Sequence, residues 1–181
     1  ARMVITGGVD TFNDIFMFMC FTKTPALSPS GHARPFDSSA DGTTLGEGVG
    51  MVALKRLSDA EKDGDRIYAV LRGIGSSSDG RGKSIYAPSA DGQVRALREA
   101  YRVSGVDPAT VELVEGHGTG TSVGDGIEVA ALEEVYRGSR PGSVALGSVK
   151  SSIGHTKAAA GSAALIKTVL NRHFLGFVGD A

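Results

Sequence analysis

Two histidines in this chain stand in matching positions, each a few residues beyond a short apolar run. Residues 111–114 lead to His117, and residues 144–146 lead to Lys150 and then to His155. Apolar runs of this length predict strands, and strand ends in α/β folds are a usual place for ligands. Glycines flank both histidines, so a substrate backbone or a thioester could approach them closely.

Two alternatives to a catalytic role stay open for these histidines. A lone histidine is more often a satisfied loop or core residue, but two in matching contexts, one with a nearby lysine, weaken that alternative. A zinc site would need a third protein ligand, and no H-x-x-x-H or C-x-x-C spacing supplies one, so no metal is expected. His32 and His173 lie in a proline-rich loop and near the C-terminal end, and we expect neither in the site.

Two acidic residues follow His117, where a helix is expected over residues 127–136. Asp125 could cap that helix, because a carboxylate suits a helix N-terminus, and capping alone would account for this residue equally well. Glu128 lies one turn further along and can face the strand-end site. We expect it to pair with Lys150, because a lysine at a reaction centre needs an anionic partner to stay charged where water is scarce.

The remaining sequence must supply the elements that position these residues. A strand over residues 3–9 is expected to be buried and to end in a tight turn at Gly7 and Gly8. The nearly all-apolar residues 11–21 predict a buried helix. After residue 90, strands and helices alternate, which indicates a layered α/β fold. Further strands are expected over residues 48–57 and 67–74, and a loop over 75–88. Further helices are expected over 92–103, with Gly105 as the stop that follows it, and over 158–170.

The composition excludes several classes of function. Lys+Arg number 19 and Asp+Glu 20, tryptophan is absent and aromatic residues make up 6%, so a nucleic-acid partner is not expected. Cys20 is the single cysteine, and its apolar neighbours predict a buried, unreactive thiol. No signal peptide is visible and no apolar run is long enough to span a membrane, so we expect a cytoplasmic protein without membrane association.

Several blocks resemble the β-ketoacyl synthase family. EGHGTGT at 115–121, with Asp125 and Glu128 after it, is similar to the first histidine motif of that family, and GSVKSSIGHTKAAAG at 147–161 is similar to the second. RPFD at 34–37 and GEG at 46–48 resemble the preceding block. Order and spacing agree to about Leu170, and the residues beyond it do not continue the family pattern.

Within the family, residues 4–29, which include GGVDTFND at 7–14, look most like the iterative type I polyketide synthases of enediyne pathways. Polyunsaturated fatty acid synthases are the near alternative, and a fatty acid ketosynthase or a non-catalytic chain-length partner subunit of the same fold also stays open. Thiolases share the fold but lack the two histidine blocks. The presence of His117, Lys150 and His155 together favours the enzyme over the partner subunit.

The resemblance implies the thiolase-like fold, in which two related α/β halves form a five-layer α-β-α-β-α arrangement, usually as a homodimer. Residues from about 1 to 70 would be the end of the N-terminal half, and about 71 to 181 the start of the C-terminal half. It also implies decarboxylative Claisen condensation of an acyl thioester with a malonyl group. That group arrives on the phosphopantetheine arm of an acyl carrier protein, and the chain itself is expected to bind no cofactor.

The resemblance also assigns roles to individual residues. Neutral His117 and His155 would donate hydrogen bonds to the thioester oxygen as it gains negative charge, and Lys150 would supply a positive field. Thr119 and Thr121 would offer hydroxyl groups to the amides of the pantetheine arm, with Asp125 as structural support.

The nucleophilic cysteine of the family is expected upstream of the strand at residues 3–9, and Cys20 does not replace it. We therefore expect the chain by itself to be inactive and unstable, with exposed sheet edges.

Overall fold

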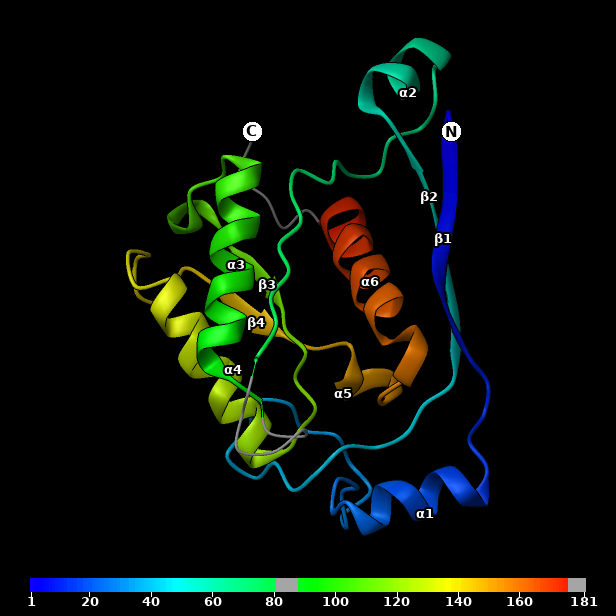
Figure 1. Ribbon diagram of the computed structural model, residues 1–181, viewed down its shortest axis with the longest axis vertical. Coiled ribbons are helices and arrows are strands. Elements are labelled where there is room, and N and C mark those ends of the chain that lie inside the picture. The colour runs from blue at the N-terminus through cyan, green and yellow to red at the C-terminus, as the bar shows by residue number, and fades with distance from the viewer. Residues whose placement is uncertain (81–87, 176–181) are drawn as a thin grey trace.

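The computed structural model describes residues 1–80 and 88–175, which form two small sheets with helices beside them (Figure 1). Strand β1 (Met3–Asp10) pairs antiparallel with β2 (Gly48–Lys55) along its whole length. Strand β3 (Leu113–Glu115) lies parallel to β4 (Ala145–Gly147), as adjacent strands of an α/β fold do. Helix α6 (Ala160–Leu175) contacts β1, β2 and β3, and so joins the two sheets.

The other helices flank these sheets, and α3 (Ala90–Ser104) packs along α4 (Ser122–Val135) on the far side of the second sheet from α6 (Figure 1). Helix α3 begins where Ser89 accepts a hydrogen bond from the amide of Gly92, and it ends at Gly105 with φ +66°, which confirms the predicted glycine stop. The helices are α1 (Ile15–Lys23), α2 (Leu57–Asp63), α3 (Ala90–Ser104), α4 (Ser122–Val135) and α5 (Lys150–Ile153), with short 3₁₀ turns at Pro108–Thr110 and Lys157–Ala159.

The turn expected at Gly7 and Gly8 does not form, because strand β1 continues through both residues to Asp10. Gly8 is needed for a close packing contact instead. A Cβ on Gly8 would lie 2.3 Å from the carbonyl oxygen of Ala158, so only glycine lets the Lys157–Ala159 turn rest against the strand.

The strand predicted over residues 67–74 is also wrong. This segment forms no β-ladder within the described residues and runs past helix α3, where the backbone of Gly73 approaches Ser104 and the carbonyl oxygen of Ala100. An apolar run becomes a strand only where a neighbouring strand satisfies its backbone groups. Part of the loop predicted over residues 75–88, residues 81–87, lies outside the described residues, as does the side chain of His173.

The apolar N-terminal elements are exposed, which corrects three expectations. Helix α1 begins at Ile15 and has no buried residue, and the thiol of Cys20 is exposed rather than buried. Strand β1 was expected to be buried, but neither of its faces is. Apolar patterning indicates that a segment is covered in the folded protein, but it does not say which part of the chain covers it. The exposed apolar side chains include Met3, Ile5 and Val9 on β1, Ile15, Phe16 and Met19 on α1, and Val49 and Met51 on β2.

The surface of this chain is large for its length. The accessible area is 11811 Å², whereas a compact monomer of this size exposes about 8,200 Å². Among the described residues the buried apolar side chains are small ones: Ala60, Val94, Ala131, Val149, Ala159 and Ala160. No helix in residues 1–80 and 88–175 combines the length and apolar character needed to cross a bilayer.

We expect the 181-residue chain, produced by itself, to show no cooperative thermal unfolding transition and to self-associate through its exposed sheet. The reason is that small buried side chains contribute little burial energy while two apolar faces stay in water. Differential scanning calorimetry with size-exclusion chromatography measures both properties. A monomer that unfolds in one sharp transition would contradict the expectation.

Candidate active site

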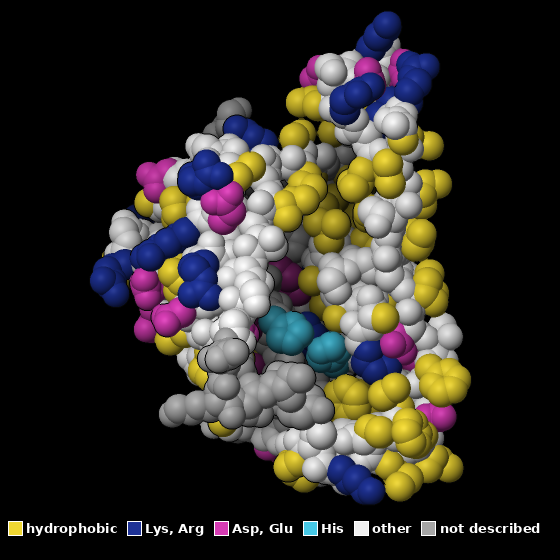
Figure 2. Space-filling model, in the orientation of Figure 1, with side chains coloured by type: hydrophobic (Ala, Val, Ile, Leu, Met, Phe, Trp, Pro, Cys, Tyr) yellow, Lys and Arg dark blue, Asp and Glu magenta, His cyan; other side chains and the backbone are white. Residues whose placement is uncertain are grey.

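The site lies where the second sheet ends, because β3 and β4 run in the same direction and finish together. Glu115 is opposite Gly147 in the register, so the loops that follow both strands leave the same edge of the sheet. These loops bring the rings of His117 and His155 to a centroid distance of 5.5 Å at an interplanar angle of 84°. In Figure 2 two adjoining histidine side chains lie at the hollow between the two parts of the molecule.

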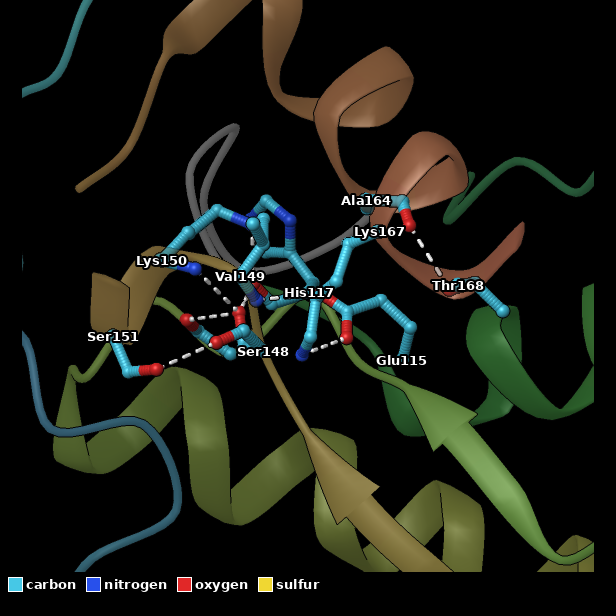
Figure 3. Close-up of polar contacts among 10 residues, drawn as sticks. Glu115, His117, Ser148, Val149, Lys150, Ser151, Ala164, Lys167 and Thr168 are labelled. Atoms are coloured by element: carbon cyan, nitrogen blue, oxygen red, sulfur yellow. Dashed lines mark hydrogen bonds and ion pairs between the residues drawn. The ribbon is translucent and has the colours of Figure 1, made fainter. Parts of the chain in front are cut away.

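The backbone of His117 is held on both sides by charged groups. Its amide donates to Oε1 of Glu128 at 2.6 Å, and the next amide, of Gly118, donates to Oε2 of the same carboxylate at 2.8 Å. Its carbonyl oxygen accepts from Nζ of Lys150 at 2.5 Å and from Oγ of Ser148 at 3.2 Å (Figure 3). Charge-assisted hydrogen bonds of this kind are strong, so the loop has little freedom.

The expected ion pair between Glu128 and Lys150 is therefore wrong. Glu128 binds two backbone amides, and Lys150 forms no ion pair with any carboxylate of the described residues. The two side chains act on opposite sides of one peptide segment, at His117. Spacing along the chain predicted that both charges face the site, but it could not show that backbone groups lie between them.

Lys150 is almost completely buried, with 2% of its surface exposed. Burial lowers its pKa because water is lost around the ammonium group, and the charges of Glu115, Glu128 and Asp125 oppose that shift. The positive charge of Lys150 adds to the effect of burial in lowering the pKa of both histidines.

His155 is fixed through its backbone and its ring. Its amide donates to the carbonyl oxygen of Thr44 at 2.7 Å, and its carbonyl oxygen accepts from the amide of Gly46 at 3.1 Å. Ring atom Nδ1 accepts a hydrogen bond from the amide of Lys157 at 2.9 Å. A neutral imidazole whose Nδ1 is an acceptor carries its proton on Nε2, so Nε2 is left to donate to a ligand.

Both imidazoles are neutral near pH 7. The pKa of His155 is lowered to about 4, mainly because its ring is buried, and the charge of Lys150 and the nearby His117 contribute to the same shift. His117 remains in contact with solvent, yet loss of water around its ring, together with Lys150, also lowers its pKa. Neutral donors backed by a buried cation are suited to stabilising negative charge on a carbonyl oxygen.

Glu115 is a site residue that the sequence pattern did not reveal. Its Oε1 accepts from the amide of Val149 at 2.5 Å, and its Oε2 pairs with Nζ of Lys167 on α6 at 2.6 Å (Figure 3). It therefore ties β3 to the start of the α5 turn and to α6. Its position two residues before His117 was a usable signal, but its two partners lie far along the chain.

Asp125 does not cap helix α4, so the capping role considered for it is wrong. The helix begins at Ser122, and Asp125 lies within its first turn, 5% exposed. The two carboxylate oxygens accept from the amides of Phe36, at 2.7 Å, and Gly120, at 3.1 Å. It thus fastens the loop at residues 34–37 to the first histidine loop.

The ring of Phe36 needs the glycines of that histidine loop. Gly118 has φ +44°, and a Cβ there would lie 2.7 Å from Cβ of Ser148 and 2.8 Å from the ring of Phe36.

In the same histidine loop, the hydroxyl groups of Thr119 and Thr121 form a hydrogen bond with each other at 2.9 Å. No cluster of His, Cys, Asp or Glu in the described part of the chain could hold a metal ion.

A layered α/β arrangement with two neutral histidines at parallel strand ends is suited to stabilising negative charge on a carbonyl oxygen. Two models of one protein family match the chain. The N-terminal domain of β-ketoacyl synthases matches residues 1–60, and their C-terminal domain matches residues 68–173. The chain belongs to the β-ketoacyl synthase family.

Individual relatives agree with this assignment. The chain is 51% identical over 172 residues to a polyunsaturated fatty acid synthase subunit of a Thraustochytrium species, covering 93% of this chain and 6% of that protein. It is 45% identical over 184 residues to a phenolphthiocerol/phthiocerol polyketide synthase subunit of Mycobacterium tuberculosis, covering 96% and 10%. The chain thus spans a tenth or less of the length of these relatives.

A solved structure confirms the fold class. The ketosynthase from module 6 of the bacillaene synthase of Bacillus subtilis 168 superposes with a TM-score of 0.90 at 42% identity, covering 95% of this chain and 31% of that one. The predicted thiolase-like α/β fold is therefore confirmed, and the chain holds part of it.

We expect Glu128→Gln to destabilise the parent protein by about 1–3 kcal/mol, because the amide nitrogen of glutamine would face a backbone donor and leave it without an acceptor. Chemical denaturation followed by fluorescence or circular dichroism measures this. Glu134→Gln on the same helix, which breaks the exposed pair with Arg98, is the matched control and should cost less than about 1 kcal/mol. Equal effects of the two substitutions would contradict the role given to Glu128.

Proposed function

We propose that this chain is part of a β-ketoacyl synthase that catalyses decarboxylative condensation in a polyketide or polyunsaturated fatty acid synthase. The observation that supports it best is the pair of neutral imidazoles 5.5 Å apart, backed by buried Lys150. The match of both β-ketoacyl synthase domains, over residues 1–60 and 68–173, supports the same reaction. It also supports a division of the chain near residue 70 into the end of the N-terminal half and the start of the C-terminal half.

In the proposed reaction, a malonyl thioester loses carbon dioxide as its C–C bond breaks, and the electron pair passes to the thioester carbonyl as an enolate. Nε2–H of His155 and the ring of His117 hydrogen-bond to that oxygen while it is negative. The enolate carbon then attacks an acyl thioester on the parent protein's cysteine. A new C–C bond forms, the C–S bond breaks, and the thiolate leaves. Splitting the reaction into acyl transfer and condensation is ordinary covalent catalysis.

The partners of this reaction follow from the carrier chemistry. We place the malonyl group on the phosphopantetheine arm of an acyl carrier protein, with Thr119 and Thr121 offering their hydroxyls to the amides of that arm. Each hydroxyl keeps hydrogen-bonding capacity beyond the bond between the two threonines. We place the acyl-carrying cysteine on a segment that precedes Met3 in the parent protein, and we expect the parent domain to be a homodimer.

Two kinds of synthase fit the chain. The 51% identity to a polyunsaturated fatty acid synthase subunit supports that class, whereas the enediyne assignment rests only on residues 4–29, which include GGVDTFND at 7–14. A chain-length partner subunit would share the fold without performing the condensation, and the residue at the nucleophile position distinguishes the two.

We expect His117→Ala and His155→Ala in the parent protein each to lower malonyl decarboxylation about 10²–10³-fold, because each removes one donor to the enolate oxygen. Release of carbon dioxide from a malonyl-loaded carrier protein measures the rate. His32→Ala, at an exposed histidine outside the site, is the control and should leave the rate unchanged. Full decarboxylation by either site variant would overturn the proposed function.

A further inference from the structure

One ion pair near the histidines has no part in the reaction described above. Nζ of Lys157 lies 3.1 Å from Oδ1 of Asp10 at the end of β1, and the two side chains are only 10% and 13% exposed. The same ammonium group donates to Oδ1 of Asn13 at 2.5 Å and to the carbonyl oxygen of Gly46 at 3.0 Å. All these partners come from the first 46 residues of the sequence, whereas Lys157 lies in the second histidine motif, two residues after His155.

The backbone of Lys157 is the group that touches the catalytic ring. Its amide donates to Nδ1 of His155 at 2.9 Å, and this bond leaves the proton of the neutral imidazole on Nε2. Lys157 also has φ +45°, a conformation that side-chain-bearing residues rarely adopt. Such a conformation persists only where the surroundings hold it in place.

We propose that Lys157 is a positioning residue, whose side chain, clamped by Asp10, Asn13 and Gly46, holds its own amide against Nδ1 of His155 and so keeps Nε2–H aimed at the substrate. This inference deepens the proposed function and rests on it. Three oxygen partners fix the ammonium group, and the strained backbone beside it is the part of the chain that would otherwise relax. Oδ2 of Asp10 also accepts from the amide of Ala158, so the clamp holds the next peptide as well.

The clamp joins the two parts of the family fold at the site. Asp10 and Asn13 lie in the region matched by the N-terminal domain, and Lys157 and His155 in that matched by the C-terminal domain. A buried ion pair is weak evidence for stability, because removing two charges from water costs about what their attraction returns. Its value here is in geometry, since it sets where one peptide N–H points.

The test uses the parent protein and follows two half-reactions separately: transfer of an acyl group to the protein, and decarboxylation of a malonyl-loaded carrier protein. Lys157→Met keeps most of the length of the side chain and removes the charge. We expect kcat for decarboxylation to fall at least about tenfold, since small displacements of a catalytic group are costly. Acyl transfer should stay within about twofold, because the proposed role of His155 is to stabilise the enolate formed by decarboxylation. A general loss of folding would instead lower both half-reactions alike.

The matched control is Lys55→Met. The side chain of Lys55 is 16% exposed, and its Nζ lies 2.5 Å from a carboxylate oxygen of Asp63 and of Asp65. Lys55 lies far along β2 from the site, so this substitution removes a lysine that is as well paired as Lys157 but does not contact the histidines. It should leave both half-reactions unchanged. Asp10→Asn gives a second variant that leaves Lys157 in place, in case Lys157→Met folds poorly. It should lower decarboxylation selectively, and the double variant should be no worse than Lys157→Met alone.

Equal loss of both half-reactions in Asp10→Asn, or no loss of decarboxylation in Lys157→Met and Asp10→Asn, would overturn the inference. His155→Ala separates this result from a failure of the proposed function. If that variant loses decarboxylation while the clamp variants retain it, only the positioning role is wrong. If that variant also retains decarboxylation, the proposed function itself is wrong.

Discussion

A buried ammonium group joins the two loops on which this site depends. Nζ of Lys150 reaches across from the loop after β4 to the carbonyl oxygen of His117 in the loop after β3. With 2% of its surface exposed, Lys150 has exchanged water for a backbone carbonyl and for carboxylates at longer range. Glu128 binds the amides on the other side of the same loop, so the peptide is fixed between a cation and an anion.

Burial and the same cation together keep the two histidines neutral. Loss of water around each ring is the larger cause of its lowered pKa, and the positive charge of Lys150 acts in the same direction. Neutral rings then need a defined tautomer, which the amide of Lys157 supplies for His155. Lys150 thus contributes both to the geometry of the loop at His117 and to the lowered pKa values of the histidines. The amide of Lys157 then sets the direction in which His155 offers its proton to a ligand.

The sequence was most informative where chemistry and local structure coincide. The glycine-flanked histidines, the strands before them and the glycine at the end of α3 were all predicted from spacing and residue type. The predictions failed where the outcome depends on a distant segment. The strand over residues 67–74 needed a partner, the cover of helix α1 could not be deduced from its own pattern, and Cys20 proved exposed.

Charged partners were hard to predict for the same reason. Glu128 and Asp125 were correctly placed near the site, but their ligands turned out to be backbone amides, for which a sequence carries no signal. Lys157 and Asp10 lie near opposite ends of the chain and meet only because Gly8 lets a turn rest on β1. Residue types suggest which charges need partners, whereas the fold decides which partners they find.

Every role proposed for these loops requires that His117 and His155 together bind the carbonyl oxygen of a malonyl thioester. A crystal structure of the parent protein with a malonyl-pantetheine analogue that cannot lose carbon dioxide would show whether they do. We expect the thioester carbonyl oxygen within about 2.7–3.1 Å of Nε2 of His155 and of a ring nitrogen of His117. A bound analogue whose carbonyl oxygen contacts neither ring would show that the two histidines do not perform the proposed role.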